Sequence, residues 1–142
     1  MKLAGFNFTK ISVEKKKDNF KDLKLETKID IEDVKEIKSN FLKSKDLFLT
    51  VKFAYDILYS PGIADLNFKG NILLAVDSKQ AKEVLRDWKE KKISEEFRLI
   101  VFNLILKKST IKALQAEEEL NLPTHFRLPS INGQAPEQSE KK

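Results

Sequence analysis

Apolar and charged residues alternate along the first half of the chain. One face of the stretch from residue 23 to 31 would carry Leu23, Leu25, Thr27, Ile29 and Ile31, while lysines and acids occupy the positions between them. Residues 47–57 and 66–76 also place apolar residues at every second position. A period of two is typical of a strand with one side buried and one side in water. The pattern therefore predicts strands in all three stretches.

The sequence Ser60-Pro61-Gly62 lies between the last two of these stretches. Proline favours the first central position of a type II turn, and glycine tolerates the positive φ of the second. We therefore expect residues 47–57 and 66–76 to form an antiparallel pair that is joined by a type II turn.

The apolar residues near the N-terminus change parity along their strand. Phe6 and Phe8 share one parity, whereas Ile11 and Val13 share the other. A bulge between the two pairs is the simplest cause, and bulges are common at the edges of sheets. We therefore predict an edge strand with a bulge around residues 9 and 10.

A first helix is expected after these strands. The pair Asp77-Ser78 provides a helix N-cap. Beyond it, apolar residues recur at the spacing of one helical face, at Ala81, Val84, Leu85 and Trp88. A helix with one such stripe needs a surface to pack on, and the sheet is the nearest one.

A longer helix should begin after Ser94 and run to about Leu120. Ser94 is a good N-cap, and the helix dipole favours the acids Glu95 and Glu96 that follow it. The stretch Asn121-Leu122-Pro123 ends the helix, because asparagine tolerates a left-handed backbone, leucine can fold back on the last turn and proline forbids continuation.

This order of elements predicts an α+β fold, with a four-stranded antiparallel sheet followed by two helices packed on its apolar face. The 142 residues are the size of one domain, which we place at residues 1–131. Residues 132–142 offer nothing to bury, so we predict that they form a disordered tail.

The stretch FRLIVFNLIL, residues 97–106, is more apolar than one packed face requires. Its apolar residues surround most of the helix, whereas packing on one sheet needs a stripe roughly 100° wide. Two explanations remain open. The surplus can form a contact with other copies and a binding groove, or residues 120–131 can fold back and cover it.

Composition narrows the class of protein. The formal net charge is +5 and no cysteine is present, which excludes disulfides, thiol catalysis and thiolate zinc sites. Residues 1–8 do not resemble a signal peptide, and the apolar run at residue 97 is about half of the ~20 residues that span a bilayer. We expect a soluble, cytoplasmic protein without an integral membrane segment.

The residues of common catalytic and cofactor sites are missing. His125 is the single histidine, so a metal site or catalytic triad is not favoured, and the four glycines form no phosphate-binding loop. The run Glu117 to Glu119 suits a solvated helix end better than an acid/base pair. We therefore expect no enzyme, no metal and no cofactor.

Two lysine runs raise the alternative of nucleic-acid binding. They lie at residues 15–17 and 89–92, and acids adjoin or interleave with both, at Asp18, Asp22, Asp87 and Glu90. A solvated surface of mixed charge is the favoured interpretation. Binding to nucleic acid is therefore not expected.

The chain resembles the SecB family of export chaperones from about residue 6 to 131. The best local similarities are Ile11-Ser12-Val13-Glu14 and Lys28-Ile29-Asp30-Ile31-Glu32, together with the order of strands and helices. The resemblance is to a divergent, archaeal-type member. It implies a chaperone that holds non-native or precursor polypeptides unfolded and soluble without ATP, and that assembles as a dimer of dimers.

The resemblance also implies which residues do this. Client contacts would fall on Thr27, Ile29 and Ile31 of a strand and on Phe97, Val101 and Phe102 of the long helix. Each of these six residues is equally well explained as plain core. Contacts between subunits would fall on Phe6, Phe8, Ile11, Val13 and Ile105.

One departure from the family concerns the acceptor of the client. The family docks SecA through an acidic outer sheet face, whereas this chain has Lys10 at a position that is acidic in the family, and Lys52 and Lys69 on its wet faces. Docking to SecA is therefore doubtful. A module of the same fold with one dedicated partner, such as a guarded antitoxin, is the alternative function.

Overall fold

The computed structural model describes residues 1–37 and 47–129. It contains four strands and two helices, in the predicted order, with these bounds: β1 Lys2–Lys15, β2 Lys24–Ile37, β3 Leu47–Ser60, β4 Ala64–Val76, α1 Ser78–Lys89 and α2 Glu95–Glu119. The predicted tail, from residue 132, lies outside the described residues. The predicted α+β fold is confirmed.

The four strands form one antiparallel sheet in the order β1-β4-β3-β2, so β3 and β4 are central and β1 and β2 are edges. The predicted alternation is confirmed on the central strands, where every second side chain is buried. On β3 these are Leu49, Val51, Phe53, Tyr55, Ile57 and Tyr59. Their partners on β4 include Leu66, Phe68, Ile72 and Leu74, and together they form the floor of the core.

Bulges change the register of both edge strands. The predicted bulge of β1 is confirmed, since Phe8 pairs with Gly70 and Lys10 with Lys69, which leaves Thr9 unpaired. Two further register shifts, between Leu3 and Gly5 of β1 and between Ile31 and Asp33 of β2, were not predicted. The shift in β2 turns Val34 inward, where 4% of its surface is exposed, and the strand continues to residue 37 instead of ending at 31.

The turn between β3 and β4 differs from the prediction in its type. Gly62 does take a positive φ of 59°, and the two strands pair antiparallel. The Ser60–Pro61 peptide bond, however, is cis, and the Ile63 N–H donates to the carbonyl of Tyr59 rather than to that of Ser60. A type II turn would close between residues 60 and 63, so this connection is one residue wider.

Both helices begin as their sequences predict, and α2 also ends as predicted. Asp77 caps α1 in a capping box with Gln80, and Ser94 caps α2 by accepting a hydrogen bond from the Phe97 N–H. After α2, Asn121 has a φ of 53°, and the Leu122 N–H donates to the carbonyl of Glu117. This is the Schellman arrangement, which satisfies the last carbonyls of the helix and reverses the chain.

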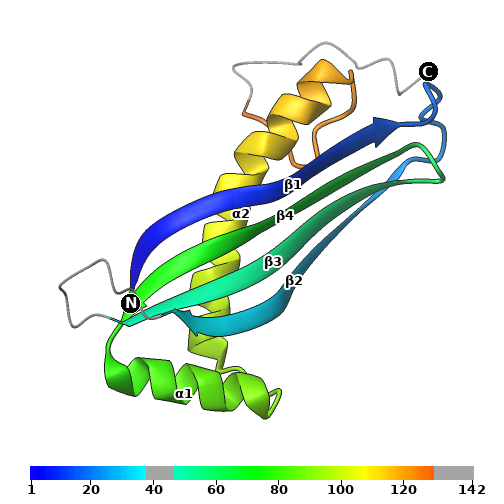
Figure 1. The fold of residues 1–142 in the computed structure, drawn as a ribbon. Coiled ribbons are helices and arrows are strands. Elements are labelled where there is room, and N and C mark those ends of the chain that lie inside the picture. The colour runs from blue at the N-terminus through cyan, green and yellow to red at the C-terminus, as the bar shows by residue number, and fades with distance from the viewer. Residues whose placement is uncertain (38–46, 130–142) are drawn as a thin grey trace.

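The helices lie on one face of the sheet, and the opposite face carries both polar and apolar side chains, the apolar ones including Phe48 and Leu58. Figure 1 shows α2 crossing the curved sheet along most of its length, with α1 near the end at which β4 stops. The buried stripe of α1 contains Ala81 and Val84, and Leu85 and Trp88 pack against the core from its margin. The predicted packing of both helices on the apolar face is therefore confirmed.

The packing around Gly70 gives a test of this core. A Cβ atom at Gly70 would lie 2.8 Å from Cζ of Phe53 and would also meet the carbonyl oxygen of Asn7. We expect Gly70→Ala to lower the free energy of unfolding by about 1–3 kcal/mol, because the ring and the backbone of β1 must both move. Urea unfolding followed by circular dichroism measures this change.

Gly5→Ala is the matched control in the same sheet. Its Cβ would lie 3.6 Å from Cβ of Leu73, which is an ordinary contact. We expect a change in stability of less than about 0.5 kcal/mol. Equal stabilities of the two variants would contradict the close approach of Phe53 to Gly70.

Candidate functional site

The buried residues of α2 follow a line that winds around the helix. This buried line consists of Phe97, Val101, Ile105, Ser109, Ala113 and Glu117, each four residues after the last. Four residues turn an α-helix by about 40° more than one full turn. The face that meets the sheet therefore rotates steadily along the helix, and it uses much of the apolar surface that one straight stripe would leave over.

Some apolar residues of α2 still face solvent. Leu99 is 53% exposed, Leu106 39% and Ile111 56%, and Phe102 packs against the core with only part of its ring. Leu99 and Leu106 are two turns apart and lie on the same side of the helix. These three residues, Leu99, Leu106 and Ile111, are called below the outer apolar residues of α2.

The segment after α2 does not cover them. Leu122 and Pro123 are buried, but Phe126 and Leu128 are themselves 40% and 48% exposed. In the described part of the chain, folding back of residues 120–129 therefore accounts for the end of the helix and not for its outer apolar residues. Apolar surface of α2 is therefore left accessible for binding, which coverage by the same chain would have removed.

The edge strand β2 extends this surface on one side of α2. Its register places Thr27 opposite Ile57, Ile29 opposite Tyr55 and Ile31 opposite Phe53, so all three point to the helix-bearing face. Thr27 is exposed, Ile29 is half-buried and Ile31 is 9% exposed. Leu25, opposite Tyr59, is 37% exposed on the same face and was not among the predicted contacts.

The edge strand β1 extends the apolar surface at the opposite edge of the sheet. The bulge at Thr9 brings both parity classes onto the helix-bearing face, since their partners Ile72, Gly70, Phe68 and Leu66 alternate along β4. Phe6, Phe8 and Val13 are half-buried against the core, and Ile11 is 52% exposed. The predicted subunit contacts of β1 therefore form one apolar edge.

Other predicted site residues lie in the core of the single chain. Phe97, Val101 and Ile105 are 2%, 0% and 0% exposed. In this conformation they support the surface from beneath and do not touch another chain. Of the predicted client contacts, Thr27, Ile29 and Phe102 retain accessible surface.

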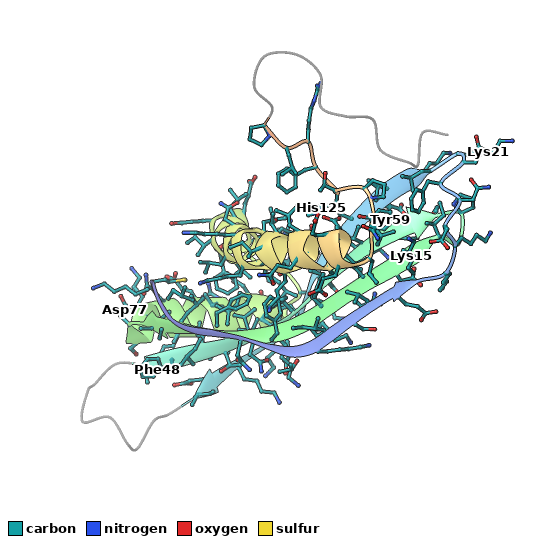
Figure 2. The ribbon with its side chains drawn as sticks, turned by 90° about the horizontal axis from the view of Figure 1, so that it is seen from above. Lys15, Lys21, Phe48, Tyr59, Asp77 and His125 are labelled. Carbon is teal, nitrogen blue, oxygen red and sulfur yellow. The ribbon has the colours of Figure 1, made fainter. Side chains whose placement is uncertain are left out.

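A polar cluster at the end of α2 was not predicted. Nδ1 of His125 lies 3.0 Å from each carboxylate oxygen of Glu117, and the hydroxyl of Tyr59 donates to Glu117 and lies within hydrogen-bonding distance of the carbonyl of Pro123. Figure 2 shows His125 and Tyr59 close together beside the last turn of α2. We call Tyr59, Glu117 and His125 the anchor cluster.

The anchor cluster corrects one prediction. Glu117 was expected at a solvated helix end, but it is fully buried, whereas Glu118 and Glu119 are exposed. The Schellman turn reverses the chain and returns His125 to the last turn of the helix, so a spacing of eight residues becomes a contact. Helix periodicity does not reveal this pair, because the chain reversal brings the two residues together.

Burial and the neighbouring carboxylate keep the Tyr59 hydroxyl protonated. Desolvation, followed by the hydrogen bond to Glu117 and the charge of Glu117, raises the pKa of Tyr59 far above its ordinary value of 10.0. Desolvation and the same carboxylate also raise the pKa of Tyr55. Tyr59 is thus a permanent donor that holds the buried carboxylate in place.

Ion pairs give mixed charge at the first of the two lysine runs. Nζ of Lys15 lies 2.7 Å from Asp18, and Nζ of Lys16 lies 2.7 Å from Asp65. Among residues 1–37 and 47–129, no three acidic or histidine side chains gather where they could hold a metal ion. Neither described helix combines the length and the apolar composition that would take it across a membrane.

The anchor cluster predicts a specific dependence of stability on pH. Tyr59→Phe should lower the free energy of unfolding by about 1–3 kcal/mol at pH 8, because a buried carboxylate loses a donor. The difference between the two proteins should shrink at pH 11. The unfolded chain then releases the Tyr59 proton while the folded protein keeps it, so only the wild type loses this contribution as pH rises. Urea unfolding at both pH values measures it.

Tyr55→Phe is the control for the loss of a buried hydroxyl. Tyr55 is 1% exposed, and Glu117 acts on its hydroxyl through charge and not through a hydrogen bond, so its removal should cost less at pH 8. A Tyr59→Phe variant that is as stable as the wild type at pH 8 would contradict the anchoring role.

Comparisons with known proteins identify the fold. No protein-family model matches the sequence, and no curated protein matches it. Among solved structures, the chain is similar to the SecB-like chaperone of Mycobacterium tuberculosis in complex with a ChAD peptide from the HigA1 antitoxin. The TM-score is 0.52 at 9% identity, over 94% of this chain and 92% of that one. The chain therefore has the fold of a SecB-like chaperone.

Proposed function

We propose that this protein is an ATP-independent chaperone that holds non-native polypeptides on its apolar face. The observation that carries the proposal is the exposure of Leu99, Leu106 and Ile111 on an otherwise well-packed helix, flanked by apolar edges of the sheet. Exposed apolar surface of this kind marks sites of protein contact. The SecB-like fold supports the same function, and we propose a divergent member of that family.

Clients would lie between α2 and β2. The accessible residues there are Thr27 and Ile29 on the strand and Phe102 on the helix, and Ile31, Phe97 and Val101 form the support beneath them. An extended apolar segment gains about 25 cal/mol for each Å² of apolar surface that it buries. This gain does not depend on direction or on exact sequence, so one surface serves many clients.

Self-association would use β1. An edge strand presents unpaired N–H and C=O groups, and a second strand can satisfy them. Phe6, Phe8, Ile11 and Val13 line this edge on the helix-bearing face. Pairing of two β1 edges would give a dimer, and packing between the helix layers of two dimers would join them, with Leu99 and Leu106 left open to clients. Ile105 would support that contact from the core.

The outer face of the sheet makes transfer to SecA a poor fit. Lys10 pairs in register with Lys69, and Lys52 is exposed on the neighbouring strand. Cations on this face repel a basic partner. We therefore propose a holding function in the cytoplasm with hand-over to an acceptor other than SecA.

A dedicated partner is the second candidate. The M. tuberculosis chaperone of similar fold was solved with a peptide from an antitoxin, which favours one defined polypeptide as the client. A protein of this kind would copurify with its partner and would not suppress the aggregation of unrelated proteins.

The first test is aggregation of a chemically unfolded client that is diluted into buffer without nucleotide. Light scattering should fall as this protein is added and should level off near one client per oligomer. The double variant with Leu99→Asp and Leu106→Asp should need at least about twice as much protein for the same suppression, because two charges replace apolar contact area.

Asn103→Asp is the matched control, since Asn103 is exposed on the same side of α2 between the two leucines. It adds a charge and removes no apolar surface, so suppression should stay close to the wild-type level. No suppression by the wild type at several-fold excess would exclude a general holding function and favour a dedicated partner.

A further inference from the structure

A cavity of about 540 Å³ lies where α1 ends and α2 begins, at the N-terminal end of the helix that carries the outer apolar residues. Its lining residues are Trp88, Lys89, Lys91, Ile93 and Arg98. Trp88 and Ile93 are half-buried and pack against the core, and the three cations are exposed. This basic cavity combines an apolar wall with a positive rim, and its volume lies within the range of about 300–1,000 Å³ that is typical of ligand sites.

The cations of the basic cavity have no acidic partner in the described part of the chain. The ion pairs there join other residues, and they include Arg86 with Asp87 on the same helix. No acidic residue lines the cavity. The lysine run that sequence reasoning assigned to a solvated mixed surface is thus partly gathered on one rim, and its charge is left for a partner.

A second cavity between the same helices has the opposite charge. It has a volume of about 260 Å³, and its lining includes Glu83, Asp87 and Glu96. Opposite charges are therefore segregated on the two cavities rather than mixed across the helix pair. Such segregation favours a negatively charged occupant in the basic cavity. It disfavours a negatively charged occupant in the second cavity.

Helix electrostatics account for only part of the positive rim. Lys89 and Lys91 lie at the C-terminal end of α1, where the helix dipole favours cations. Arg98, by contrast, is the fourth residue of α2, close to the end at which the dipole favours acids. The helix dipole therefore does not account for the charge of Arg98, which is left for a partner.

Lys91 occupies a backbone position that usually holds glycine. Its φ is 58°, and the hydrogen bonds from Lys91 N–H to Trp88 and from Lys92 N–H to Asp87 form a second Schellman arrangement. Glycine adopts this conformation without a Cβ penalty. Lysine at this position therefore lowers stability relative to glycine, and it places a cation at the cavity.

We propose that the basic cavity binds an acidic polypeptide segment that carries an aromatic side chain between carboxylates. The ring would pack on Trp88 and Ile93, and the carboxylates would pair with Arg98, Lys91 and Lys89. An oligonucleotide is less favoured, because the cavity offers one ring and one compact rim rather than a basic groove that follows a backbone. The choice of a polypeptide over a small amphiphile rests on the proposed function.

Trp88 is the single tryptophan of the chain and reports on this site directly. The probe is a blocked hexapeptide with two phenylalanines between two pairs of glutamates, titrated while Trp88 fluorescence is recorded. We expect the emission to move to shorter wavelength and to saturate, and the affinity to fall as salt is raised. The same peptide with lysines in place of glutamates should bind at least about tenfold more weakly, because like charges meet at the rim.

Three variants separate binding from folding. Arg98→Glu should weaken binding of the acidic peptide by about tenfold, and Lys92→Glu, an adjacent exposed cation that does not line the cavity, should change it by less than about twofold. Lys91→Gly should raise the melting temperature, because glycine suits the left-handed backbone, and should weaken the peptide at the same time. A purely structural Lys91 would give the first effect without the second.

Each opposite outcome overturns the proposal. It fails if Trp88 emission does not respond to the peptide at millimolar concentration, or if the acidic and basic peptides bind equally well. It also fails if laurate or an octamer of thymidine nucleotides binds more tightly than the acidic peptide and displaces it. Suppression of aggregation is measured separately and should persist in Arg98→Glu, so failure of the holding function and failure of this site are distinguishable.

Discussion

The structure depends on how a helix of 25 residues is laid across one curved sheet. Burial advances by four residues at each step from Phe97 to Glu117, while the helix repeats every 3.6 residues. The contact face therefore turns around the helix as the helix crosses the strands. This constraint explains why apolar residues occur on nearly every side of α2, and why some of them still have no cover: a side that faces the sheet at one end faces solvent at the other.

The same rotation brings a carboxylate into the core. Glu117, at the end of the buried line, lies beneath the returning chain and is held by Tyr59 from β3 and by His125. A buried charge is costly unless it is paired and hydrogen-bonded, and Tyr59 and His125 supply these partners. Here the arrangement fixes the path of residues 120–125 and leaves Phe126 and Leu128 at the surface.

Two surfaces of different chemistry result from this architecture. The apolar face on α2 and the two edge strands suits partners that are recognised by burial, which is non-directional. The basic cavity between the helices suits partners that are recognised by charge, which selects more strongly. The two surfaces are lined by different residues, so each can be altered without changing the other, and general holding and selective recognition can be measured independently.

Local pattern was enough for the elements of this fold, and contacts over long distances were not. Alternation, caps and turn residues gave four strands, two helices and the bulge of β1, because each signal is carried by neighbouring residues such as Phe8 and Ile11 or Asn121 and Leu122. The bulge of β2 escaped because Val34 is the single buried residue beyond it. Only the tertiary structure decided that Phe97, Val101 and Ile105 are core while Leu99 and Leu106 are not, since that division depends on the angle at which α2 meets the sheet. The tertiary structure alone also placed His125 against Glu117 and Arg98 beside Lys91 on one rim. Chain reversals bring these residues together, and a reversal leaves no periodic pattern in the sequence.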